Sequence, residues 1–221
     1  MGSVRLADFG MRRSTIPVIA GRIGTRERLM ASGERLIGLH GMENLPLDRI
    51  ARDAAQANKF AVQYHFGSRR HLAQAILDLR VGELDRRRGA YLEAIGPSPS
   101  LEALVAGFVL PIAEQVEEEG RFAFARFLLQ YSVQLTPWPG VEHPATAGLA
   151  HGHTRRLFTM LGQRVPAIEE MRLHQRLGLL LNLPLVLLSS HAAHADRPGQ
   201  RAELDDAIGM IAAALASDAA C

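Results

Sequence analysis

The spacing of apolar residues is the feature of this sequence that most restricts its fold. From Thr25 to His40, apolar or small side chains recur every three or four residues, with charged residues between them. This period places the apolar side chains on one face of an α-helix. Similar spacing returns along most of the chain, whereas the alternation typical of strands does not stand out in the sequence. The sequence therefore predicts an all-α protein.

Capping residues divide the N-terminal part into short helices. Thr25 suits the N-cap of a first helix, and Gly41 suits the position just past its end. Pro46 suits the first turn of a second helix, which gives way near residues 56–57. Asn58 then suits the cap of a third helix of about two turns. Two short helices joined by a tight turn predict a helix-turn-helix unit over residues 25–72.

The rest of the chain, residues 73–221, is expected to form a second helical domain. Ser68 suits the cap of a long helix that runs to about residue 94, and the glycine and prolines of residues 96–100 end it. The expected later helices cover residues 101–119, 121–135, 151–164, 167–194 and 201–217.

Charge is unevenly distributed along the chain. Residues 1–95 contain 16 Lys and Arg against 10 Asp and Glu, whereas residues 96–221 contain 9 against 13. A basic N-terminal part favours contact with a polyanion there. Residues 1–24 carry four arginines and no stable period, and we expect a flexible basic arm.

Several classes of protein are disfavoured by the sequence. The single cysteine, Cys221, excludes a disulfide within the chain and is consistent with a cytoplasmic location. The longest apolar run, residues 177–188, is too short to span a bilayer. Nucleophile-elbow, phosphate-loop and zinc-helix motifs do not occur, so we expect neither an enzyme nor a metal or other cofactor.

One segment resembles a known family. Residues 24–72 read GTRERLMASGERLIGLHGMENLPLDRIARDAAQANKFAVQYHFGSRRHL. This stretch resembles the DNA-binding region of TetR-family transcriptional regulators, and VQYHFGSRRHL resembles the end of their recognition helix. The resemblance covers about residues 25–80. The sequence departs from the family pattern at Gln56, where the turn usually carries glycine, at Pro46, and at Arg69, which replaces a frequent lysine.

The resemblance implies roles in binding double-stranded DNA. A helix in the major groove reads base edges with its exposed side chains, which here predicts contacts from Asn58, Lys59, Phe60 and Gln63. The resemblance further implies that Tyr64 and His65 face the sugar-phosphate backbone and that Phe66 packs inward. Arg69 and Arg26, at the starts of two helices, are expected to bind phosphates.

The resemblance also implies that the second domain binds a small ligand and forms a homodimer. Two long helices with apolar stripes near the C-terminus suit a four-helix interface between subunits, although the same stripes also suit packing within one subunit. An apolar or aromatic effector is expected, with the following ligand candidates: Phe108, Phe127, Tyr131, Trp138, Phe158 and His174.

The sequence thus favours a transcriptional repressor that binds a palindromic operator as a homodimer and is released by a small molecule. The alternative is a ligand-binding or protein-interaction module that keeps the helix-turn-helix shape without binding DNA.

Overall fold

The computed structural model describes residues 24–43, 45–114, 123–135, 152–190 and 199–217. Within these ranges the regular elements are helices and no strand occurs, which confirms the all-α prediction. The helices are α1 (Thr25–His40), α2 (Leu47–Asp53), α3 (Ala61–Phe66), α4 (Arg69–Ile95), α5 (Leu101–Ala113), α6 (Ala123–Leu135), α7 (Gly152–Arg164), α8 (Glu170–Leu180), α9 (Asn182–Ser190) and α10 (Gln200–Ala216).

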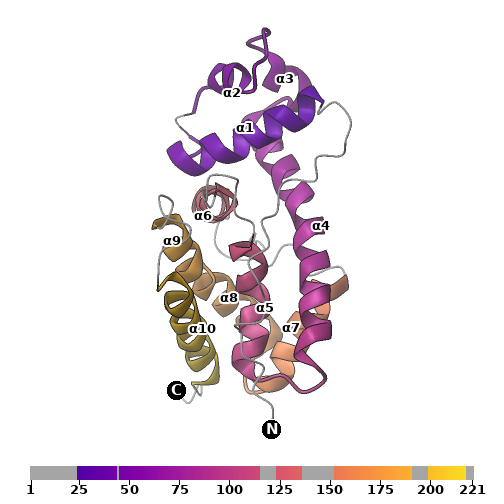
Figure 1. Cartoon of the computed structure of the whole chain (residues 1–221), viewed down its shortest axis with the longest axis vertical. Coiled ribbons are helices and arrows are strands. Elements are labelled where there is room, and N and C mark those ends of the chain that lie inside the picture. Colours follow the sequence, from indigo (N-terminus) through magenta and orange to yellow (C-terminus); the bar gives the residue numbers. More distant parts are fainter. Residues whose placement is uncertain (1–23, 44, 115–122, 136–151, 191–198, 218–221) are drawn as a thin grey trace.

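The helices form an elongated molecule with two parts. Helices α1, α2 and α3 gather at one end, which we call the head, and α4 runs from the head towards the opposite end (Figure 1). Along the rest of its length α4 packs against α5 and α7, whereas α8, α9 and α10 lie on the other side of α5, and α6 lies directly against α1. Because α4 is continuous, residue 72, where the sequence predicts a domain boundary, lies inside a helix that both parts share.

The ends of the head helices follow from local chemistry. Gly41 ends α1 at a φ of 74°, and its N–H donates to the Ile37 carbonyl, so the predicted stop is confirmed. The predicted cap at Thr25 is wrong by one residue, because Gly24 occupies the N-cap position and Thr25 begins the helix. Ser68 caps α4 as predicted, since its Oγ accepts from the His71 N–H at 3.1 Å.

The long helix expected over residues 167–194 is interrupted. Helix α8 ends at Leu180 and α9 begins at Asn182, with Leu181 between them. Pro184 explains the break, because proline has no N–H to donate to the carbonyl of Leu180, four residues earlier, and its ring crowds that carbonyl.

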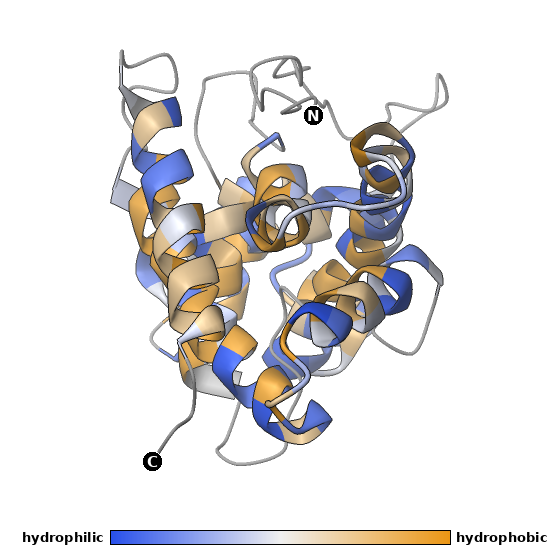
Figure 2. Cartoon of the chain, turned by 90° about the horizontal axis from the view of Figure 1, so that it is seen from below, coloured by the Kyte–Doolittle hydropathy of each residue, from blue (hydrophilic) through white to orange (hydrophobic). Residues whose placement is uncertain are grey.

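A continuous apolar core lies along the inner faces of the helices, and their hydrophilic residues mostly turn outward (Figure 2). The apolar stripes expected to meet a second subunit lie largely in this core. The buried members are Leu177, Leu181, Leu188, Leu204, Ile208, Ile211 and Leu215. These side chains therefore pack within one subunit, which is the alternative that the sequence left open.

Polar contacts join α4 to helices that are distant in the sequence. The carboxylate of Glu34 in α1 accepts two hydrogen bonds from the Arg80 guanidinium in α4, at 2.7 and 2.6 Å, and both side chains are buried. The Asp85 carboxylate in α4 accepts from the backbone N–H of Thr154 at 2.8 Å and from its hydroxyl at 2.7 Å, and so caps α7. Burial acts to raise the pKa of Asp85, but the hydrogen bonds from Thr154, together with the backbone N–H and charge of His153, outweigh it and the net pKa is lowered.

Candidate nucleic-acid interface

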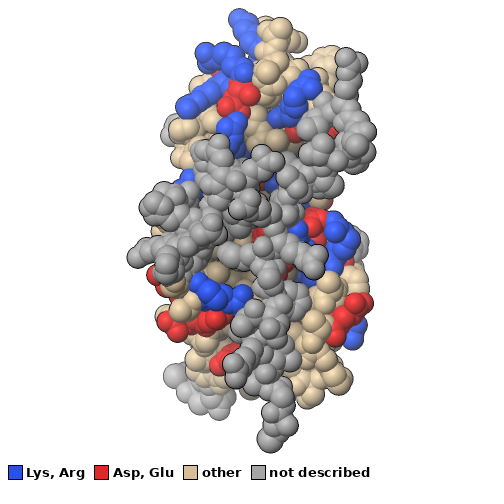
Figure 3. Space-filling model, viewed as in Figure 1, with Lys and Arg blue, Asp and Glu red and all other residues tan. Residues whose placement is uncertain are grey.

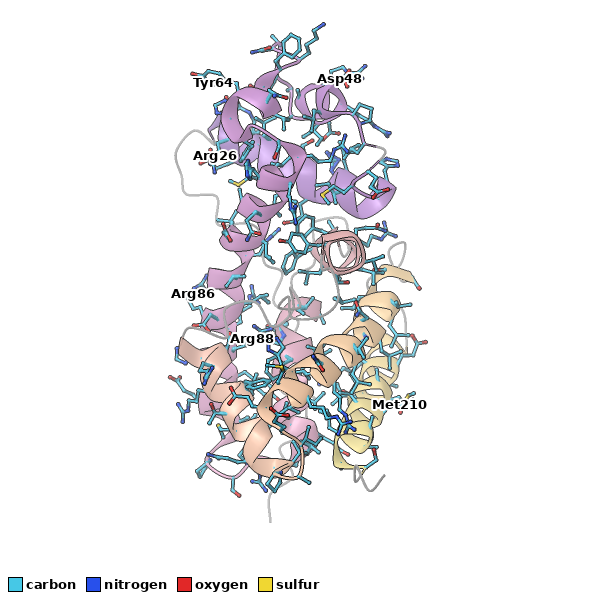
Figure 4. All side chains as sticks on the ribbon, turned by 180° about the vertical axis from the view of Figure 1, so that it is seen from behind. Arg26, Asp48, Tyr64, Arg86, Arg88 and Met210 are labelled. Atoms are coloured by element: carbon cyan, nitrogen blue, oxygen red, sulfur yellow. The ribbon has the colours of Figure 1, made fainter. Side chains whose placement is uncertain are left out.

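Helix α3 presents one buried and one exposed face. Ala61, Val62 and Phe66 are buried against the head, which confirms the predicted inward packing of Phe66. Gln63 and Tyr64 point outward, and the Tyr64 side chain is 81% exposed (Figure 4). A helix of six residues has little stability of its own. The orientation of its exposed face therefore depends on contacts with neighbouring elements.

The residues just before α3 extend this exposed surface. The Asn58 Oδ1 accepts from the Phe60 N–H at 2.9 Å, and this hydrogen bond shapes the turn that leads into the helix. Phe60 is 63% exposed, and the Lys59 ammonium lies 5.0 Å from the centroid of its ring. Asn58, Lys59, Phe60, Gln63 and Tyr64 are thus all exposed at the same end of the molecule.

In the turn between α2 and α3, the residue with positive φ differs from the one that the sequence indicated. Ala55 has a φ of 53°, and within the described ranges it is the one non-glycine residue with positive φ. The Ala55 N–H donates to the Arg52 carbonyl, and the Gln56 N–H donates to the Ala51 carbonyl. This pair of bonds is a Schellman motif, whose left-handed position is usually glycine. The expectation that Gln56 occupies this position is therefore wrong.

Both arginines expected to bind phosphates make contacts within the chain. Arg26 donates from Nη1 to the His65 carbonyl at 3.0 Å, and its guanidinium carbon lies 4.4 Å from the centroid of the Phe66 ring. Arg69 donates from Nη1 to the Glu43 carbonyl at 2.8 Å. His65 is half-buried, with its ring 5.1 Å from the Tyr64 ring in an edge-on arrangement.

Further basic side chains lie near this surface, and the sequence reasoning did not single them out. Arg49 and Arg52 are exposed on α2, and Arg70 is exposed in the first turn of α4. Lys and Arg side chains crowd the upper end of the molecule, whereas acidic residues are more frequent further down (Figure 3). The excess of basic residues before residue 95 was the signal that could have identified them.

The predicted ligand residues lie in the second part of the molecule. Phe127 and Tyr131 of α6 form one pair, with ring centroids 5.8 Å apart, and Phe158 of α7 forms another with His174 of α8, also at 5.8 Å. Phe108 of α5 is fully buried, with the Arg88 guanidinium 5.2 Å from its ring centroid. Trp138 lies outside the described residues.

Among the described residues, no group of three or more His, Cys, Asp or Glu side chains could hold a metal ion. No helix in the same ranges is both long and apolar enough to cross a bilayer.

Comparisons with known proteins find one kind of likeness. No family model matches the sequence, and no curated protein matches it. Among solved structures, the chain is similar to a TetR-family transcriptional regulator from Streptomyces coelicolor, with 16% sequence identity and a TM-score of 0.40. The match covers 87% of this chain and 96% of the other. Because identity and TM-score are low, a function for this protein has to rest on its own contacts.

Proposed function

We propose that this protein is a DNA-binding transcriptional regulator that acts as a repressor. In this proposal α3 enters the major groove, Asn58, Lys59, Phe60 and Gln63 read bases, and Tyr64 contacts the backbone. The observation that carries the proposal is the exposed row of polar and aromatic side chains on α3 and on the turn that leads into it, at the basic end of the molecule.

The chemistry of this row suits a base-reading surface. A lysine ammonium donates to guanine O6 and N7, a glutamine amide pairs with adenine, and an apolar ring contacts the thymine methyl. Two aromatic side chains as exposed as Phe60 and Tyr64 are unfavourable in water. A partner that covers them is therefore favoured, and the neighbouring arginines favour an anionic one.

A homodimer is part of the proposal, because a palindromic operator requires two heads separated by roughly one helical turn of DNA. Exposed apolar side chains on α8, α9 and α10 support this part of the proposal. They include Leu179, Val186 and Met210, with exposed fractions of 52%, 46% and 62%. Met210 projects from the outer side of α10 (Figure 4).

Release by a small apolar or aromatic ligand is the third part of the proposal. The aromatic pairs Phe127–Tyr131 and Phe158–His174 supply suitable chemistry for such a ligand. Close packing of α1 on α6 supports a mechanical connection between the ligand region and the head. At Gly38 of α1, an added Cβ would lie 3.1 Å from the Ala123 carbonyl oxygen of α6. Movement of α6 would therefore displace α1 and change the separation of the heads.

The test is selection from a library of random double-stranded DNA. The wild-type dimer is expected to enrich a palindrome, and the double variant Lys59→Ala with Gln63→Ala is expected to lose it. Arg156→Ala with Gln163→Ala is the matched control, because it removes a basic and an amide side chain from exposed positions on α7. This control should enrich the same palindrome as the wild type.

If the folded wild-type protein enriches no sequence, DNA reading by α3 is refuted. The protein would then be better described as a ligand-binding or protein-interaction module with a helix-turn-helix shape. If the double variant Lys59→Ala with Gln63→Ala enriches the same palindrome as the wild type, the proposed roles of Lys59 and Gln63 in base reading are refuted.

A further inference from the structure

Arg26 makes a contact that no role at a phosphate requires. It lies in the first turn of α1, 39 residues before His65 in the sequence, yet its Nη1 donates to the His65 carbonyl at 3.0 Å. Its guanidinium also lies over the ring of the buried Phe66, 4.4 Å from the centroid. One side chain therefore contacts the last two residues of α3.

This contact lies at the C-terminal end of α3, where a positively charged donor stabilises a helix. The carbonyls of the last turn of a helix have no partner within the helix, and the C-terminal end carries partial negative charge. A guanidinium at this end satisfies one such carbonyl and complements the charge. Planar stacking on an aromatic ring adds a preference for one orientation.

The helix has few other means of holding its direction. It has six residues and buries only Ala61, Val62 and Phe66. Its exposed side chains Gln63 and Tyr64 come just before the two residues that Arg26 holds. A small rotation of α3 would therefore move both away from their base and backbone targets.

We propose that Arg26 is a positioning residue that fixes the orientation of the reading helix, and that its effect on DNA binding passes through α3 rather than through a phosphate. This inference rests on the proposed function for its consequence in DNA reading. The contact of Arg26 with His65 and Phe66, which we call the Arg26 clamp, is present in the free protein. Its effect on the stability of α3 can therefore be measured without DNA.

The first measurement is backbone amide hydrogen exchange of the free protein over residues 58–68. Arg26→Ala is expected to speed exchange in α3 several-fold, because local opening becomes easier when the clamp is removed. The matched control is Arg28→Ala, two residues further along α1, where Arg28 donates to Thr25 within its own helix. This control should leave exchange in α3 unchanged. Equal exchange in wild type and Arg26→Ala would overturn the inference.

The second measurement compares binding to the selected palindrome with binding to a scrambled duplex of the same length, over a series of salt concentrations. Removing a positioning residue should lower the preference for the palindrome by about tenfold, the effect of losing one charge-assisted hydrogen bond. The slope of log affinity against log salt should stay the same. Arg26→Lys should lose most of this preference too, because an ammonium keeps the charge but lacks the planar stacking group.

A phosphate contact gives the opposite pattern. The salt slope of Arg26→Ala would then fall by about 0.9, Arg26→Lys would bind nearly as well as wild type, and the preference for the palindrome would persist. That pattern would overturn the inference, as would an unchanged preference combined with faster exchange. If the wild-type protein selects no palindrome, the proposed function fails, and the exchange measurement still decides whether Arg26 clamps α3.

Discussion

The replacement of Ala55 by glycine should stabilise the protein, although it removes a methyl group and increases the freedom of the unfolded chain. Ala55 has a φ of 53° between α2 and α3 and occupies the left-handed position of a Schellman motif. A residue with a Cβ in this region loses about 1–2 kcal/mol relative to the right-handed region. Glycine avoids this cost but loses about 0.5–1 kcal/mol more backbone entropy on folding.

The difference between these terms predicts that Ala55→Gly raises the free energy of unfolding by about 0.5–1 kcal/mol. For a chain of this size, that corresponds to a rise in the thermal midpoint of about 1–4 °C. Thermal and urea unfolding followed by circular dichroism would measure the change. Protein concentration must be the same for all variants, because the proposed dimerisation would contribute to apparent stability.

Ala57→Gly is the matched control, because Ala57 is an exposed residue of the same turn whose φ is not positive. Glycine there increases chain entropy without relieving strain, so stability should fall by up to about 1 kcal/mol. If both variants lose stability equally, the left-handed conformation of Ala55 does not cost what this reasoning assigns to it.

Two further predictions concern the buried ion pair between α1 and α4 and the proposed contact between subunits. Glu34→Gln should lower the free energy of unfolding by about 3 kcal/mol, because it leaves the buried Arg80 guanidinium without its carboxylate. Asp48→Asn, in the exposed pair with Arg52, should cost less than about 1 kcal/mol, and equal losses in urea unfolding would contradict the difference in burial. Met210→Glu should convert the proposed dimer into monomer, measured by analytical ultracentrifugation, because it places a charge among the exposed apolar side chains of α8, α9 and α10. A variant that sediments as a dimer would exclude α10 from the interface.

The sequence predicted the features of this fold that depend on neighbouring residues. The stop at Gly41 and the cap at Ser68 follow from side-chain chemistry within a few positions, and both are confirmed. The inward packing of Phe66, which the family resemblance implied, is confirmed as well. The break between α8 and α9 was missed although its cause, Pro184, is also local. The apolar residues keep their helical spacing on both sides of Pro184. This spacing led to the prediction of one continuous helix, although proline lacks the N–H that such a helix requires.

The positive φ at Ala55 was missed for a different reason. The motif rule looks for glycine at the left-handed position, and this turn contains none, so the rule could not place that position. The hydrogen bonds from Ala55 and Gln56 back to α2 determine it. The strain is tolerated because α2 is fixed by its packing on α1, for example through the Ser32 hydroxyl, which donates to the Ile50 carbonyl.

Contacts between helices far apart in the sequence could not be predicted from the spacing of residues within each helix. The role of Gly38 depends on α6, because a Cβ at this position would lie only 3.1 Å from the Ala123 carbonyl oxygen and the α6 backbone would have to shift to accept it. On α6 itself, Arg126 donates from Nε and Nη2 to the Ser189 carbonyl, at the end of α9. The head therefore contacts α6, and α6 contacts α9, which carries the exposed Val186. Any ligand or partner that shifts α6 relative to α9 must strain either the contact at Gly38 or the hydrogen bonds of Arg126. Close packing permits such a shift only as a joint movement of these helices.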